Sequence, residues 1–234
     1  MLTTMLTTAL ALAAASTASP LANAPKFPPT SKSNGFSLVA YVSDPALATK
    51  VFAPNPAPGK NWTVGGVHVG AGQSTAVLGS VSSTVFYQNG TATGSHKKTD
   101  GLIRDGPNTY PYSIVLGTPN DAGAIYIGLN VGEPTLGVSI SSGPVAEVTY
   151  APASRGTFLV CNETEPTYGR PQYPIRFAPK AKSVPAGCVP ISLLAQCATL
   201  VGLDANGLEY EHDTPATVSC YKDVASIDWS QYRL

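Results

Sequence analysis

The sequence predicts an all-β domain, built as a β-sandwich of many short strands with little helix. Glycine and proline are abundant, at 22 and 21 of 234 residues, which favours turns over long helices. Runs of β-branched and aromatic residues are short, and clusters of Gly, Pro, Asn and Asp separate them, as in a sandwich or barrel. No window of about eleven residues has a convincing helical period.

The predicted strands follow one another along most of the chain. In order they are 36–42, 63–69, 75–78, 83–87, 91–93, 113–116, 124–130, 136–140, 146–150, 157–161, 173–177, 189–195 and 216–220. The Asn89-Gly90 pair predicts a hairpin tip between 83–87 and 91–93. Residues 223–229 are expected to form one helical turn near the C-terminus.

The N-terminal residues predict a secreted protein. Residues 1–18 carry no charged side chain and join an apolar segment to small residues, as in a signal peptide. Residues 19–35, rich in Pro and Ser, are expected to be a flexible leader before one β-rich domain over 36–234. Residues 178–187 are a candidate boundary between two subdomains, although we prefer a long surface loop.

The rest of the sequence agrees with an extracellular protein, either free or associated with a cell wall. No later segment reaches the about 18 apolar residues that indicate a membrane span, and the polar residues 228–234 do not fit a GPI signal. We therefore expect no membrane anchor.

Charge excludes two classes of partner. Charged residues make up only 12% of the chain, and 14 basic side chains balance 14 acidic ones. These numbers exclude a nucleic-acid binder with a basic face and argue against a polybasic membrane-surface protein. We expect any partner, a host protein or a cell-wall polysaccharide, to be bound through shape and apolar contact.

Four cysteines lie in the last third of the chain, at Cys161, Cys188, Cys197 and Cys220. An even number in a secreted chain predicts two disulfides, and three connectivities exist. If the residues between Cys188 and Cys197 are a strand or a helix, these two cysteines are too far apart to pair. We favour Cys161–Cys188 with Cys197–Cys220.

Three Asn-x-Thr sequons predict a glycoprotein, at Asn61, Asn89 and Asn162. Asn89 is the preferred site because it lies at the predicted hairpin tip. Asn162 is the least favoured, since it follows a cysteine expected to be bridged.

Catalytic and cofactor motifs are weak, and we do not expect an enzyme, a cofactor or a metal. The sequence has no Gly-x-Ser-x-Gly motif, and the Gly-rich residues 65–75 are interpreted as a bulge or tight turn. The three histidines are His68, in a predicted strand, and His96 and His212, in polar segments. The acidic residues around His212 are the only metal candidate, and a solvated loop is the preferred interpretation.

Aromatic side chains are the remaining candidates for ligand contact. Tyrosine and tryptophan rings can stack on sugars while neighbouring amides bind the hydroxyl groups. The alternative is that these rings fill the core with their polar ends at the surface. The candidates are Trp62, Tyr110, Tyr112, Tyr168 and Tyr173.

Several segments together resemble a family of small secreted proteins of filamentous fungi, mostly uncharacterised, some of them labelled "IgE-binding protein". The segments are FSLVAYVSDP at 36–45, NWTVGGVHVGAG at 61–72, TFLVCNE at 157–163, GCVPISLLAQC at 187–197 and DVASIDW at 223–229. The resemblance spans residues 33–234. It implies a fungal extracellular β-rich protein and brings no catalytic residues.

Three hypotheses for function follow. The first is a secreted fungal glycoprotein without enzymatic activity, acting at the cell surface or as an effector or antigen towards a host. The second is a carbohydrate- or cell-wall-binding module, which requires exposed aromatic rings. The third is a secreted hydrolase, which requires two acids or a Ser–His pair that meet in a cleft.

Overall fold

The computed structural model describes residues 27–55, 57, 59, 61–79, 84–89, 101–105, 112–121, 123–165, 170–179, 184–200 and 215–232. The signal peptide predicted at 1–18, the start of the leader, Tyr110, Tyr168, His96 and His212 lie outside these residues.

The fold is all-β, as predicted, but it is a closed eight-stranded barrel and not a sandwich. Each barrel strand pairs with two neighbours, and the pairings β14–β8 and β2–β5 join what would otherwise be free edges. A sandwich keeps two separate sheets, so these two pairings exclude it. In order around the barrel the strands are β2 (Gly35–Val42), β5 (Val85–Gln88), β6 (Leu102–Arg104), β7 (Tyr112–Pro119), β8 (Ile125–Val131), β14 (Ile175–Ala178), β11 (Thr157–Cys161) and β15 (Cys188–Ala198).

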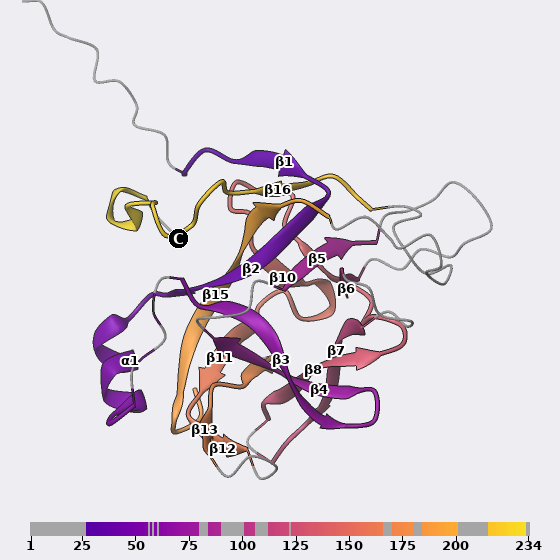
Figure 1. The fold of residues 1–234 in the computed structure, drawn as a ribbon. Helices are drawn as coiled ribbons and strands as arrows, with labels where there is room; N and C mark the ends of the chain where they lie inside the picture. The colour runs from indigo at the N-terminus through magenta and orange to yellow at the C-terminus, as the bar shows by residue number, and fades with distance from the viewer. Residues whose placement is uncertain are drawn as a thin grey trace, which may run out of the picture.

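A hairpin of β3 (Thr63–Gly70) and β4 (Gln73–Gly79) connects two of these strands (Figure 1). Its strand β3 pairs with β2 at Val39, and β4 pairs with β8 at Gly128. The first half of β2 pairs with β5 instead, so β2 divides one edge between two partners. The hairpin thus spans from β2 to β8 and contributes Val64, Ala76 and Leu78 to the core.

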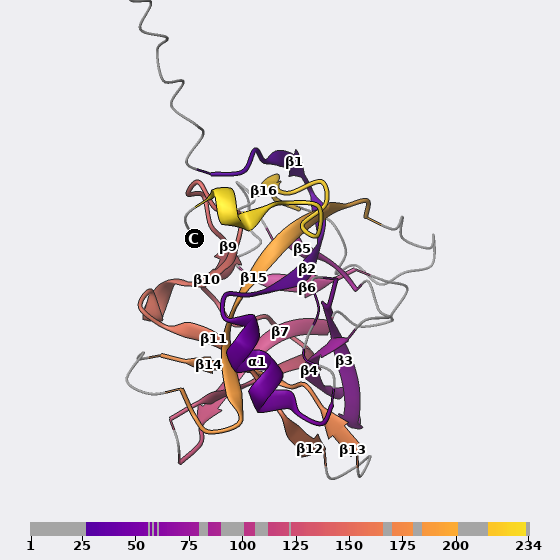
Figure 2. The same ribbon diagram turned by 90° about the vertical axis from the view of Figure 1, so that its left-hand side faces the viewer.

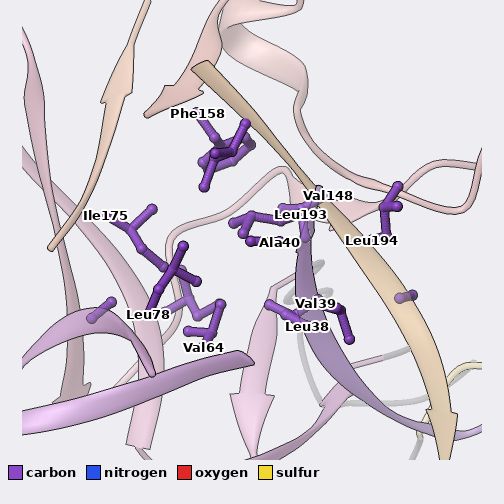
Figure 3. Packing of buried hydrophobic residues seen from close by; sticks show 14 of the residues in the cluster. Leu38, Val39, Ala40, Val64, Leu78, Val148, Phe158, Ile175, Leu193 and Leu194 are labelled. Carbon is purple, nitrogen blue, oxygen red and sulfur yellow. The ribbon is translucent and has the colours of Figure 1, made fainter. Parts of the chain in front are cut away.

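The main hydrophobic core is one cluster of buried side chains from the barrel strands and the hairpin, and residues of flanking elements such as Phe52, Val138 and Val218 extend it. The longest register joins β15 to β2, from Ile191–Val42 to Ala198–Gly35. Figure 3 shows Ala40 of β2, Leu78 of β4 and Ile175 of β14 among the buried side chains. Strands of the closed barrel and of the hairpin therefore share one continuous core.

The other elements lie outside the barrel. Three two-stranded sheets pair β1 (Ser31–Ser33) with β16 (Val218–Cys220), β9 (Val138–Ile140) with β10 (Val148–Tyr150), and β12 (Glu163–Glu165) with β13 (Arg170–Gln172). The helices within the described residues are α1 (Pro45–Phe52) and two 3-10 turns, η1 (Ala151–Ala153) and η2 (Trp229–Gln231). None of the described helices is long and apolar enough to span a membrane.

Helix α1 packs against β15 on the side of the barrel seen in Figure 2. Asp44 caps it, because the Asp44 side chain accepts a hydrogen bond of 2.8 Å from the N–H of Leu47. Pro45 follows at the first helical position, where its missing N–H costs nothing. Ala48 and Phe52 are the buried residues of the helix.

Two local expectations differ from the structure. The end of the expected leader is part of the fold, since Ser31–Ser33 pair with Val218–Cys220. The hairpin tip predicted at Asn89 is wrong, because β5 pairs with Leu102–Arg104 and the Asn89 N–H donates to the Gly101 carbonyl. The segment 178–187 connects two strands that both flank β11 in one sheet.

Candidate functional site

An open groove of about 630 Å³ lies between the β3–β4 turn and the strands β7 and β8. This volume falls within the roughly 300–1,000 Å³ of small-molecule sites. The groove is lined by Ala71, Gly72, Gln73, Tyr112, Val115, Asn130, Val131 and Glu133.

The β3–β4 turn is fixed against the end of β8 by two hydrogen bonds. The N–H of Val131 donates to the carbonyl of Gly72 at 2.9 Å. The N–H of Ser74 donates to the side-chain oxygen of Asn130 at 3.2 Å. Gly72 has a φ of 66°, a conformation that suits glycine, and a register shift between His68 and Gly70 precedes the turn. The Gly-rich segment is therefore a bulge and a tight turn, as predicted.

The groove offers one aromatic ring, two amides and one carboxylate. The half-buried Tyr112 ring has the Arg104 guanidinium 5.9 Å from its centre, within cation–π range. Gln73 and Glu133 are exposed, and Val131 adds apolar surface with 39% of it exposed. The amides and the carboxylate provide hydrogen-bond donors and acceptors beside an aromatic ring and a valine side chain. This combination suits a small polar ligand with apolar faces.

Of the predicted aromatic residues that the structure describes, Tyr112 is the one that lines this groove. Trp62 and Tyr173 meet elsewhere, with ring centres 4.7 Å apart at 70°, and Phe52 lies 5.2 Å from Tyr173. Both Trp62 and Tyr173 are half-buried and pack against the core, and burial raises the pKa of Tyr173. These rings form a packed edge-to-face cluster and not a flat platform.

Gln73, Asn130 and Glu133 were not predicted as site residues. Each follows a turn or lies near a strand end, and no spacing motif connects them. Only the pairing of the β3–β4 turn with the end of β8 brings them together.

The four cysteines form Cys161–Cys188 and Cys197–Cys220, the pairing that the sequence favours. Cys161 and Cys188 lie opposite each other on β11 and β15, and Glu163 is close to them. These three residues do not suit a metal ion, because both sulfurs are bonded to each other and no thiolate remains. Glu163 accepts a hydrogen bond of 2.5 Å from Arg176, which also lies 5.3 Å from the centre of the Tyr126 ring.

The sequon asparagines have three different environments. Asn61 is exposed in the turn before β3. Asn89 is half-buried and pairs with Pro215. Asn162 is half-buried, and its side-chain nitrogen donates to the carbonyl of Val51 at 3.1 Å.

His68 lies exposed on β3, opposite Ser74, and does not line the groove. Among the described residues that line the groove, Glu133 supplies the single carboxylate. A pair of facing acids or a Ser–His pair, which the hydrolase hypothesis requires, is not part of this lining.

Comparison with known proteins gives two matches. Residues 32–197 match the family model described as "Domain of unknown function (DUF7907)". The chain is also similar to a protein of Stachybotrys chartarum named "Antigenic protein SchS34", with 30% identity over 220 residues, which are 89% of this chain and 95% of that protein. No solved structure matches. Both matches agree with the resemblance to uncharacterised fungal proteins, and the relative is named as an antigenic protein.

Proposed function

The chain belongs to the family described as domain of unknown function DUF7907, and from this premise we propose an extracellular protein that acts by binding and not by catalysis. Its role is that of an antigen or effector, at the cell surface or towards a host. The observation that carries the proposal is the similarity to a protein named as antigenic over 89% of the chain.

Two features of the structure support an extracellular role. Both disulfides are formed, and disulfides persist mainly in oxidising compartments. Cys161, Cys188 and Cys220 are also buried, which keeps reductants away from the sulfur atoms.

The composition of the groove supports binding over hydrolysis. Glycoside hydrolysis by the usual route needs two carboxyl groups, about 5–9.5 Å apart, on the two sides of the bond that breaks. From the part of the chain that the structure describes, the lining contributes the carboxylate of Glu133 alone, beside the amides of Gln73 and Asn130.

Carbohydrate binding is the second candidate function, and the groove favours it. A sugar ring has apolar C–H faces and an edge of hydroxyl groups. Tyr112 and Val131 match the faces, while Gln73, Asn130 and Glu133 match the edge.

The test uses the full chain, purified from culture medium with its disulfides intact. It is incubated with insoluble chitin, β-glucan, cellulose and intact host cells, and both retained protein and released soluble sugar are measured. Retention without release of sugar is the expected result. Release of soluble sugar would show catalysis and overturn the proposal, as would failure to bind any of the four surfaces.

Matched variants separate the groove from the rest of the surface. Tyr112→Ala and Gln73→Ala change the lining, whereas Tyr232→Ala and Gln231→Ala make the same changes near the C-terminus. If a polysaccharide is bound in the groove, only the first pair loses retention. Binding to host cells that all four variants keep would support the antigen or effector role and contradict carbohydrate binding.

A further inference from the structure

The three sequons differ in how freely the structure presents the asparagine amide. Asn61 is exposed in a turn that the Trp62 N–H closes by donating to the Gly59 carbonyl at 3.1 Å. A branched sugar on Asn61 therefore extends into solvent. The turn is outside the strands, so the glycan displaces no ladder hydrogen bond.

Asn162 already uses the nitrogen that a glycan requires. Its Nδ2 donates to the Val51 carbonyl, near the end of α1, at 3.1 Å. Its backbone N–H donates to Gly187 at 2.8 Å, and the preceding residue is the bridged Cys161. A sugar on Nδ2 would have to fit between the end of the helix and β11, at a half-buried position.

Asn89 is also held by its neighbours. It continues the pairing of β5, since its N–H donates to Gly101 at 3.0 Å, and it pairs with Pro215 on its other side. Its side chain is half-buried. Strand pairing on both sides leaves less room for a glycan than the turn at Asn61.

We infer that Asn61 is the N-glycosylation site of this protein, a conclusion that rests on the proposed extracellular role. The donor is an oligosaccharide attached to a lipid pyrophosphate. Nδ2 of Asn61 attacks C1 of the first sugar, a nitrogen–carbon bond forms, and the bond between C1 and the phosphate oxygen breaks. The lipid pyrophosphate leaves and Nδ2 loses one proton. Thr63, at the third position of the sequon, begins β3.

Glycosylation at Asn61 also distinguishes the Trp62–Tyr173 cluster from the groove that Tyr112 lines. Trp62 follows Asn61 directly and packs edge-on to Tyr173 at 4.7 Å. The glycan is therefore attached next to this cluster, while the Trp62 ring itself packs against the core. Tyr112 lines a groove that includes neither Trp62 nor Asn61, and that groove stays open to other ligands.

The test maps the glycan on the full chain secreted by a eukaryotic host. Protein from the medium is treated with peptide N-glycosidase in ¹⁸O-water, which converts each glycosylated Asn to labelled Asp, and peptides are analysed by mass spectrometry. The expected result is label at position 61 and none at 89 or 162. Asn61→Gln loses the mass of one glycan, whereas the matched variant Asn162→Gln keeps it.

The outcomes distinguish this inference from the proposed function. Secreted protein with unlabelled position 61 overturns the inference alone. Label at position 89 or 162 contradicts the claim that the structure selects Asn61. Unglycosylated protein that stays inside the cell overturns both. Mapping of the unsubstituted chain decides the question even if Asn61→Gln is secreted poorly.

Discussion

The hydroxyl of Tyr221 accepts a hydrogen bond of 3.2 Å from the backbone N–H of Ala146, although 75 residues separate them. Both residues are buried, with 1% of Tyr221 exposed. The Tyr221 N–H donates to Ala195 of β15, and its ring lies edge-on to Trp229 at 5.5 Å. Tyr221 therefore fixes both the segment before β10 and the C-terminal segment to the barrel.

Tyr221→Phe is expected to lower the free energy of unfolding by about 1–2 kcal/mol, because it leaves the buried N–H of Ala146 without its acceptor. Urea unfolding followed by circular dichroism measures this loss as a lower midpoint at an unchanged slope.

Tyr150→Phe is the matched control for this variant. The Tyr150 ring packs edge-on to Phe177 at 5.5 Å and is half-buried. Removal of its hydroxyl is expected to change the free energy of unfolding by less than about 0.5 kcal/mol. Equal losses in the two variants would contradict the role given to the Tyr221 hydrogen bond.

Alkaline pH is expected to destabilise the protein through two tyrosines. The pKa of Tyr221 is raised above its ordinary value of 10.0 mainly by burial; the Ala146 hydrogen bond opposes this, and Glu147 adds to it. Burial also raises the pKa of Tyr173. The folded state thus favours the neutral phenols. Their contribution to the free energy of unfolding is complete below pH 10 and is lost as the pH rises through the folded-state pKa values.

The measurement is the free energy of unfolding at neutral pH and at several values above 10. A steeper decline in the unsubstituted protein than in Tyr221→Phe is expected, since phenylalanine cannot titrate. Parallel curves for the two proteins would refute the assignment to Tyr221.

The sequence predicted most strands because their local pattern is strong. Residues 36–42, 157–161 and 189–195 are apolar, rich in branched side chains and bounded by turn residues, and each is now a barrel strand. Short elements were missed for lack of such a pattern. Ser31–Ser33 and Glu163–Glu165 are polar, and only their pairing partners make them strands. Helix α1 has a signal in Asp44-Pro45 but is too short to show a period.

Closure of the barrel could not be predicted from local sequence. The hydrophobic pattern of a strand is the same in a sandwich and in a barrel, because in both architectures one face of the strand is buried. The choice of a closed barrel depends on the pairing of β2 with β5 and of β8 with β14. These pairings join segments about 50 residues apart in sequence. The same applies to the groove, since Gln73 and Glu133 meet only through such pairings.

Gly72→Ala is expected to cost about 1–2 kcal/mol of stability, because a residue with a side chain rarely adopts a φ of 66°. The added methyl would also lie 3.3 Å from Val131 at the edge of the groove. Thermal unfolding measures the effect as a lower Tm.

Gly79→Ala is the matched control, since a methyl group there meets nothing within 4 Å. Its Tm is expected to be close to that of the unsubstituted protein. If the two alanine variants unfold at the same temperature, the positive φ at position 72 does not make glycine necessary for the stability of the turn.

Loss of the two disulfides is expected to have different structural consequences despite similar energies. They close loops of 27 and 23 residues, so the chain-entropy model gives each about 3–4 kcal/mol. Cys161–Cys188 joins β11 and β15, which are already paired, whereas Cys197–Cys220 connects β16 to the barrel.

Replacing Cys197 and Cys220 by alanine should therefore expose the C-terminal segment to limited proteolysis in native buffer, before global unfolding. The Cys161→Ala, Cys188→Ala double variant should lower the unfolding midpoint yet keep that segment protected. Equal protease sensitivity in both double variants would show that hydrogen bonds of Tyr221, and not the disulfide, hold the segment in place.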